Sequence, residues 1–357
     1  MNGSVLQKTM NNLLFYYREG NPKTVYFAIT NDCNSSCSTC RFPKETEKRY
    51  VSLSDAINAI DFLHENGVRF VSITGGEPFL HPDLMEICRH IDRKGMKVTY
   101  IPTNGKLITD AVAKELSGFY TGIIGISIDP DHDDRTLHTR SIALDVIRNA
   151  RTALEERNLK TYAGVLLTAH SLPISKCIGA ARSLGFKRIV FSFPQVSESS
   201  PYFASADIDD LRLSANFARD MVAQIKDAKR NFSIYNFDDT LDDFERSYTG
   251  DAQRHPCTGG SRMYYVDWDL KVYKCFSCPE SYGRIGKLQD LPVENGTCTN
   301  CTQQAFRDMS YLFGIYDAFH AIKGSVLDGM KYKGPVSIRE HMKNFSVLLQ
   351  LYRGGFI

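Results

Sequence analysis

The sequence predicts an α/β protein whose main part is a partial (βα)6 barrel. Apolar runs typical of β-strands alternate with helical patterns at spacings of about 30 residues, as in repeated βαβ units. The runs are almost continuously apolar, which indicates a parallel sheet covered on both faces. Six of them precede residue 225, at residues 24–30, 70–76, 97–105, 122–129, 160–168 and 187–194. In such a TIM-like barrel, functional residues lie on loops at the carboxyl ends of the strands.

Composition bounds the class of protein. The chain has 357 residues, with 43 Lys and Arg against 41 Asp and Glu, and this near-balance argues against nucleic acid as a partner. Apolar residues make up 43% and charged residues 24%, as in globular proteins. No apolar run approaches the roughly 20 residues that a bilayer needs, and the start lacks a secretory signal. We therefore expect a cytoplasmic protein without a transmembrane segment.

The elements divide the chain into five parts. Between the first strands lie two helical patterns, residues 52–67 and residues 80–95, and the second begins near Pro82 and ends at Gly95. Residues 196–210 change composition and are predicted to form a loop over the barrel mouth. The expected parts are a helical extension (1–23), the barrel (24–225), a linker or extra helix (226–256), a Cys- and Gly-rich domain (257–302) and a helical, aromatic-rich tail (303–357).

The ten cysteines are clustered, which in a cytoplasmic protein favours metal or redox chemistry over disulfides. Cys33, Cys37 and Cys40 lie within eight residues, and five more lie between residues 257 and 301. Cys88 and Cys177 stand alone at apolar positions of helical patterns. A free cysteine packs like a small hydrophobic residue, so these two are predicted to be core thiols.

The first cluster has the spacing C-x3-C-x2-C and directly follows the first strand. Structural zinc takes four ligands, and neither a histidine nor a fourth cysteine is nearby. Three thiolates at this spacing suit a [4Fe-4S] cluster, and they leave one iron open to a substrate or cofactor. Zinc with a distant fourth ligand, or three unliganded thiols in a surface loop, are the alternatives.

A loop of this spacing after the first strand of a βα barrel resembles the radical S-adenosylmethionine (SAM) enzymes. The second strand ends in a sequence similar to the family's GGEP motif, which meets the methionyl amino group of SAM, and the fourth ends in one that resembles its S-x-D-G segment near the SAM ribose. The resemblance covers residues 24–195. It implies that SAM is bound by strand-end residues, namely Gly75, Gly76, Glu77, Pro78, Thr103, Asn104, Ser127 and Asp129.

The resemblance also implies an activity. Such an enzyme reductively cleaves SAM at the [4Fe-4S] cluster to a 5′-deoxyadenosyl radical, which abstracts hydrogen from a substrate. Oxidation, epimerisation, or carbon–carbon or carbon–sulfur bond formation can follow, and the electron comes from a donor such as flavodoxin or ferredoxin. The alternatives are radical adenosyl transfer to, or modification of, a lipid or isoprenoid, and a non-enzymatic iron–sulfur sensor or electron carrier. A zinc-binding interaction protein is a further alternative.

The second cysteine group allows two interpretations. The spacing Cys275-x2-Cys278-x19-Cys298-x2-Cys301 fits a zinc ribbon and leaves Cys257 unused. Alternatively, residues 257–275 resemble the opening of the SPASM and twitch domains appended to radical SAM enzymes. That resemblance implies one auxiliary [4Fe-4S] cluster on Cys257, Cys275, Cys298 and Cys301, with Cys278 spare or in place of one ligand.

The substrate is the least determined feature. Only residues 1–23 precede the first strand, so we expect no leader-binding domain and a small molecule rather than a ribosomal peptide. The aromatic residues of the tail either pack on the barrel or line a groove for an apolar substrate, so peripheral membrane contact stays open. Four further side chains follow the fourth and fifth strands and are candidates to face the cavity: Arg135, His138, Arg140 and His170.

Overall fold

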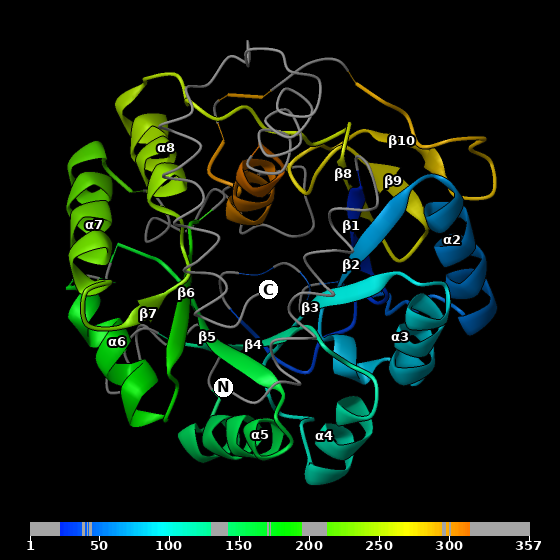
Figure 1. Cartoon of the computed structure of the whole chain (residues 1–357), viewed down its shortest axis with the longest axis horizontal. Helices are drawn as coiled ribbons and strands as arrows, with labels where there is room; N and C mark the ends of the chain where they lie inside the picture. Colours follow the sequence, from blue (N-terminus) through cyan, green and yellow to red (C-terminus); the bar gives the residue numbers. More distant parts are fainter. Residues whose placement is uncertain are drawn as a thin grey trace, which may run out of the picture.

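The computed structural model describes residues 22–37, 40, 42, 45–129, 142–169, 171, 173–194, 213–294, 298–299 and 301–314. Its centre is one ten-stranded sheet with the strand order β10-β9-β8-β1-β2-β3-β4-β5-β6-β7 (Figure 1). The strands are β1 (Lys23–Ala28), β2 (Val68–Thr74), β3 (Lys97–Thr103), β4 (Ile123–Ile128), β5 (Lys160–Leu166), β6 (Arg188–Ser192), β7 (Ser233–Ile234), β8 (Met263–Val266), β9 (Lys271–Tyr273) and β10 (Ser281–Arg284).

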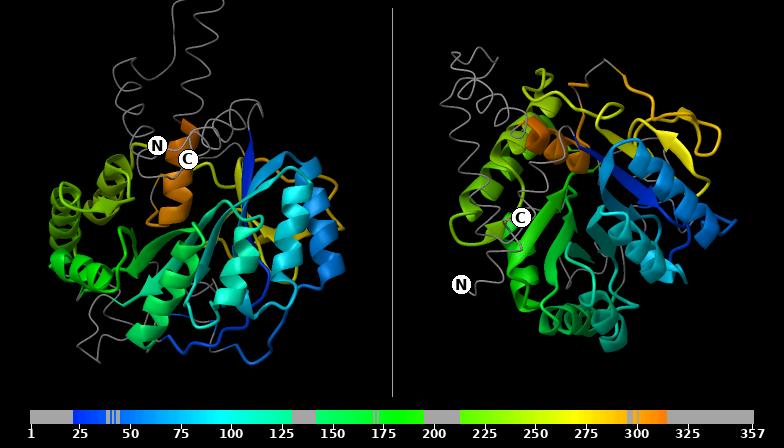
Figure 2. Two further views of the ribbon diagram at one scale, coloured as in Figure 1. Left: turned by 60° about the horizontal axis from the view of Figure 1, so that its bottom comes forward. Right: turned by 45° about the vertical axis from the view of Figure 1, so that its right-hand side comes forward.

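Strands β1 to β7 follow one another in parallel, and helices cover the outside of the curved sheet (Figure 2). The predicted partial βα barrel is therefore confirmed. The helical elements are α2 (Leu53–Glu65), η2 (Pro78–Leu80), α3 (Leu84–Arg93), α4 (Asp110–Ser117), α5 (Leu144–Glu156), α6 (Ile174–Ser183), α7 (Ala215–Ala228) and α8 (Asp238–Thr249).

The helices between the first strands bury apolar residues at helical spacing. Helix α3 buries Leu84, Ile87, Cys88 and Ile91, which recur at the spacing of one helix face. Cys88 and Cys177 have no exposed surface, so the prediction that they are core thiols is confirmed.

The Cys-rich region is joined to the barrel rather than standing apart as a separate unit. Strand β8 pairs in parallel with β1, from Thr24 opposite Met263 to Phe27 opposite Val266, and β9 and β10 extend the sheet antiparallel. The sequence pattern did not predict this, because pairing between strands more than 200 residues apart leaves no local signal.

A further helix at residues 304–314 lies between α8 and β8 (Figure 1). On one side the hydroxyls of Thr240 and Tyr311 join it to α8 through Asp308 and Asp239. On the other side Tyr26 of β1 donates to the carbonyl of Ala305 and its ring stacks on Phe306. The helix thus spans the opening between the last barrel strands and β8.

The expected boundary at residue 225 falls inside α7, and residues 226–256 also contain β7 and α8. The expected N-terminal extension up to residue 21, the loop at 196–210 and the tail from residue 315 lie outside the described residues. So do four candidate cavity residues: Arg135, His138, Arg140 and His170. Within the part of the chain that the structure describes, no helix is long and apolar enough to cross a membrane.

Candidate active site at the carboxyl ends of the strands

The first cysteine loop leaves the carboxyl end of β1 and is tied back at its base. The Thr30 hydroxyl donates to the carbonyl of Arg49 (2.8 Å), and the Asn31 amide donates to the carbonyl of Glu47 (2.8 Å) and accepts from the Arg49 N–H (2.7 Å). The Tyr50 hydroxyl donates to Asp32 (2.5 Å). These contacts fix both ends of the segment that carries the three cysteines.

The glycine pair after β2 packs directly on this loop. A Cβ on Gly75 would lie 2.2 Å from the Thr30 carbonyl oxygen, and one on Gly76 would lie 2.1 Å from that of Asp32. The Gly76 N–H donates to Thr30 (3.0 Å) and the Glu77 N–H to Asp32 (2.8 Å). Since any side chain would meet backbone here, only glycine permits this contact.

The side chain of Glu77 is 1% exposed and points into the protein. One carboxylate oxygen accepts from the Thr103 hydroxyl (2.9 Å) and the Phe79 N–H (3.2 Å), and the other from the Asn104 N–H (2.7 Å). Burial raises the pKa of Glu77 to about 7, although these hydrogen bonds favour the charged form. Glu77 therefore ties the loop after β2 to the loop after β3.

The remaining predicted SAM-binding residues lie on the same side of the sheet. Pro78 opens η2 and is buried, and Thr103 and Asn104 end β3 and are also buried. Ser127 lies near the end of β4 opposite Gly164 of β5, and Asp129 follows with 3% of its surface exposed. The structure thus brings the predicted residues together at the carboxyl ends of β1 to β4, where barrel enzymes carry their active sites.

The three cysteines are partly buried on this face. Burial raises the pKa of Cys33, while a backbone hydrogen bond from Ser35 lowers it. Among the described residues, no three His, Cys, Asp or Glu side chains are grouped closely enough to hold one metal ion. A four-iron cluster takes one thiolate per iron, so its ligands stand farther apart, and three thiols on one loop fit that donor set.

The second cysteine group gathers from three chain segments. Cys257 and Cys298 face each other in an antiparallel bridge, with the Cys257 N–H donating to the Cys298 carbonyl (3.0 Å). The sulfurs of Cys275 and Cys278 are 3.7 Å apart. Cys257, Cys275 and Cys298 pack with a cluster that contains Tyr26 of β1 and Phe306. The group therefore lies against the edge of the barrel beside β1.

Backbone N–H groups point at several of these sulfurs. The Gly259 N–H lies 3.4 Å from the Cys257 sulfur, and the Gln303 N–H lies 3.2 Å from that of Cys301. The backbone of Ser277 donates to Cys275 in the same way. Each donor follows its cysteine by two residues, as Ser35 follows Cys33. Such hydrogen bonds to sulfur stabilise a thiolate ligand.

Cys278 differs from Cys257, Cys275 and Cys301. Hydrogen bonds from Cys275 and the nearby Lys274 ammonium lower the pKa of Cys278 to about 7, and the same pairing raises the pKa of Cys275. Lys274 is itself held by Glu294 at 2.6 Å. The hydrogen bonds to the sulfur of Cys278 come from Cys275, three residues earlier. Those to the sulfurs of Cys257, Cys275 and Cys301 come from the backbone two residues later.

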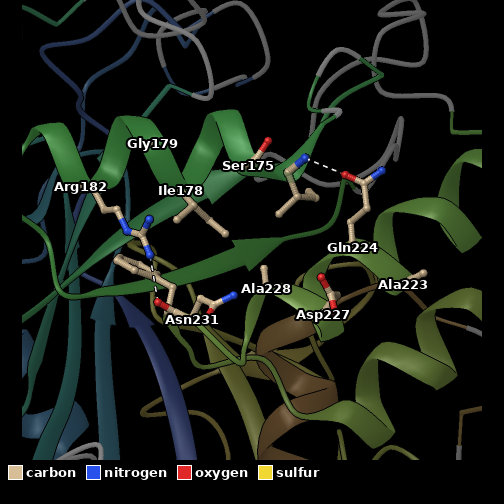
Figure 3. Close-up of a pocket in the computed structure, with 11 residues that line it drawn as sticks. Ser175, Ile178, Gly179, Arg182, Ala223, Gln224, Asp227, Ala228 and Asn231 are labelled. Atoms are coloured by element: carbon tan, nitrogen blue, oxygen red, sulfur yellow. Dashed lines mark hydrogen bonds between the residues drawn. The ribbon is translucent and has the colours of Figure 1, made fainter.

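A pocket of about 530 Å³ lies elsewhere, between α6 and α7 (Figure 3). There Gln224 accepts from the Ile174 N–H (3.0 Å), and Arg182 donates to the Asn231 carbonyl (2.9 Å). None of the predicted site residues lines it, so it belongs to the outer helical layer rather than to the active site.

Sequence reasoning missed Asn34 and Lys106. Asn34 lies between Cys33 and Cys37, and Lys106 follows Gly105. Their positions next to predicted motifs were the available signal, but their contacts with each other depend on the fold.

Comparison with known proteins agrees with this geometry. Residues 27–168 match the family model of the Radical SAM superfamily. The chain is 36% identical over 101 residues to an S-adenosylmethionine-dependent nucleotide dehydratase of Thermoplasmatales archaeon (strain ISO4-H5), covering 28% of this chain and 36% of that protein. It is 24% identical over 294 residues to the AdoMet-dependent heme synthase of Methanosarcina barkeri (strain Fusaro / DSM 804), covering 74% and 79%.

Two solved structures share the fold. AdoMet-bound anSMEcpe superposes with a TM-score of 0.54 at 18% identity, covering 74% of this chain and 78% of that one. Streptococcus suis SuiB bound to S-adenosylmethionine superposes with a TM-score of 0.57 at 14% identity, covering 80% and 69%. The chain spans about a third of the length of the nucleotide dehydratase. Strand order, the cysteine loop and the family match together show that residues 27–168 form a domain of the radical SAM superfamily, whose members use a [4Fe-4S] cluster and SAM.

Proposed function

We propose that this chain reductively cleaves SAM at a [4Fe-4S] cluster held by Cys33, Cys37 and Cys40 and abstracts hydrogen from a small organic substrate. The observation that carries the proposal is the backbone contact between the cysteine loop and Gly75–Gly76, which leaves room for no side chain. Such a contact fixes three thiols relative to the strand ends where SAM would lie.

When bound, the cluster and SAM supply a primary carbon radical that takes a hydrogen atom from the substrate. The chain's own residues orient these groups. The three thiolates would each bind one iron, and the backbone of residues 75–78, which lies beside the loop, would meet the amino group of SAM. Thr103 and Asn104 support that backbone, and we assign the ribose to Ser127 and Asp129.

Two tyrosines pack over Gly125 of β4. Tyr100 and Tyr162 stack with ring centroids 5.6 Å apart. A Cβ on Gly125 of β4 would lie 2.6 Å from the Tyr100 hydroxyl oxygen, so the glycine makes room for this stack. The stack therefore links β3 and β5 across β4, the strand that leads to Ser127 and Asp129.

For the second group we propose an auxiliary [4Fe-4S] cluster on Cys257, Cys275, Cys298 and Cys301. The two sets differ only in Cys257 and Cys278, and the backbone hydrogen bond from Gly259 to the sulfur of Cys257 supports the set that contains Cys257. A zinc ion on Cys275, Cys278, Cys298 and Cys301 is the alternative. With the auxiliary [4Fe-4S] cluster, residues 257–302 would form a SPASM- or twitch-like auxiliary domain attached to the barrel of residues 24–225.

Fewer observations bear on the substrate class than on the cofactors. Proteins similar to this chain are named for acting on nucleotides and heme and for the biosynthesis of the bacteriocin subtilosin, so no single substrate follows. We propose oxidation, epimerisation or bond formation on a small molecule in the cytoplasm, with flavodoxin or ferredoxin as the reductant. Adenosyl transfer to a lipid or isoprenoid is the alternative.

The test is SAM cleavage by the anaerobically reconstituted and reduced chain. The proposal predicts 5′-deoxyadenosine and methionine in equal amounts. An iron-loaded chain that forms neither would contradict it and would favour the electron carrier.

A further inference from the structure

The loop after β3 contacts the cysteine loop through hydrogen bonds to one residue, Asn34. The Asn104 side-chain amide donates to the Asn34 side-chain oxygen (2.7 Å), and the Lys106 ammonium donates to the Asn34 carbonyl (2.9 Å). Asn34 lies between Cys33 and Cys37, so this double contact acts on the segment between two cluster ligands. Asn34 and Lys106 are both exposed, so burial alone does not account for their contact.

Further hydrogen bonds hold Asn104 in place in this contact. The Asn104 N–H donates to Glu77 (2.7 Å), and the Lys106 N–H donates to the Asn104 side-chain oxygen (3.0 Å). Both ends of the Asn104 side-chain amide are therefore engaged, one by Asn34 and one by Lys106. Asn104 is 7% exposed. An arrangement that uses both ends of a buried amide favours a structural link over a direct ligand of SAM.

The contact with Asn34 also places the positive charge of Lys106 near Cys33. The Lys106 ammonium lies 2.9 Å from the carbonyl oxygen of Asn34, the residue that directly follows Cys33. Reducing an iron–sulfur cluster adds negative charge, so a nearby cation favours the reduced form.

We propose that Asn104 and Lys106 are positioning residues of the catalytic cluster. Through Asn34 they hold the segment from Cys33 to Cys37 in its ligand-binding arrangement, and the Lys106 charge raises the reduction potential of the cluster. This inference rests on the proposed function of the cysteine loop.

The first experiment compares Asn104→Ala with Asn66→Ala in the reconstituted full chain. Asn66 also links two segments, by accepting from the Leu291 N–H (2.6 Å), but it lies at the amino end of β2, whereas the cysteine loop follows the carboxyl end of β1. We expect Asn104→Ala to weaken iron retention against a chelator by about 10- to 100-fold, as for other residues that support metal ligands. The loss is confined to the cluster whose electron paramagnetic resonance signal changes on adding SAM. Equal retention in the two variants would overturn the positioning role.

The second experiment measures the reduction potential of the SAM-responsive cluster in Lys106→Met, Lys106→Arg and the control Lys114→Met on α4. We expect a more negative potential in Lys106→Met, and values close to wild type in Lys106→Arg and Lys114→Met. An unchanged potential in Lys106→Met, or an equal shift in the control, would overturn the charge effect.

The outcomes separate the two proposals. A wild-type chain that takes up no SAM-responsive cluster would defeat the proposed function and this inference together. A wild-type chain that cleaves SAM, with Asn104 and Lys106 variants that match it in iron retention and potential, would defeat the inference alone.

Discussion

The two cysteine groups are built in opposite ways. Cys33, Cys37 and Cys40 come from one eight-residue stretch, and neighbouring strand-end loops hold that stretch from outside. The auxiliary cysteines come from three segments, which meet through the Cys257–Cys298 bridge and pack beside aromatic rings. The first group thus depends on precise loop contacts, and the second on the docking of β8 against β1.

The largest expected effect tests the first group. Cys37→Ala removes a thiolate of the catalytic cluster, so SAM cleavage by the reduced chain is expected to fall to background. Iron of the auxiliary group stays, because its ligands lie on other segments. Cleavage at the wild-type rate would exclude the loop as the catalytic site.

The second group is tested by replacing Cys257 and Cys278, one at a time, with alanine. Cys257→Ala is expected to remove about four irons per chain, the content of one four-iron cluster, and Cys278→Ala none. Metal analysis of both purified variants measures this. The zinc-ribbon interpretation makes the reverse prediction, with metal lost from Cys278→Ala.

Gly76→Ala tests the backbone contact of the first group. The added methyl group would lie 2.1 Å from the Asp32 carbonyl oxygen, so we expect a loss of about 1–3 kcal/mol in the free energy of unfolding. Gly179→Ala on α6 is the matched control, because nothing lies within 4 Å of its Cβ position. Denaturant unfolding measures the free energy of unfolding of both variants. Equal values for Gly76→Ala and Gly179→Ala would refute the tight contact.

The most gradual effect concerns the buried acid that joins the strand ends. Burial raises the pKa of Glu77 from 4.5 to about 7, so between these values the folded chain holds a proton that the unfolded chain has lost. The free energy of unfolding therefore falls as the pH rises through this window, by at most about 1.4 kcal/mol per pH unit. Glu77→Gln should remove this slope in cluster-free protein. An unchanged slope would show that Glu77 is not the group responsible.

The sequence predicted the barrel and its first six strands, because βα units are local patterns, and the C-x3-C-x2-C loop indicated the strand ends that carry the candidate site. It did not predict that β8 extends the barrel sheet or that the helix at residues 304–314 spans its opening. Nor did it predict that Glu77 turns its carboxylate toward Asn104, or that Lys106 reaches Asn34. These features depend on contacts between distant segments, which residue spacing does not encode.

The most direct test of the two-cluster account is the content of iron, sulfide and zinc per chain in anaerobically reconstituted protein. Two four-iron clusters predict about eight irons and eight sulfides without zinc. About four irons with one zinc would contradict the auxiliary cluster and leave the catalytic one standing. A folded chain with little or no iron would contradict the account as a whole.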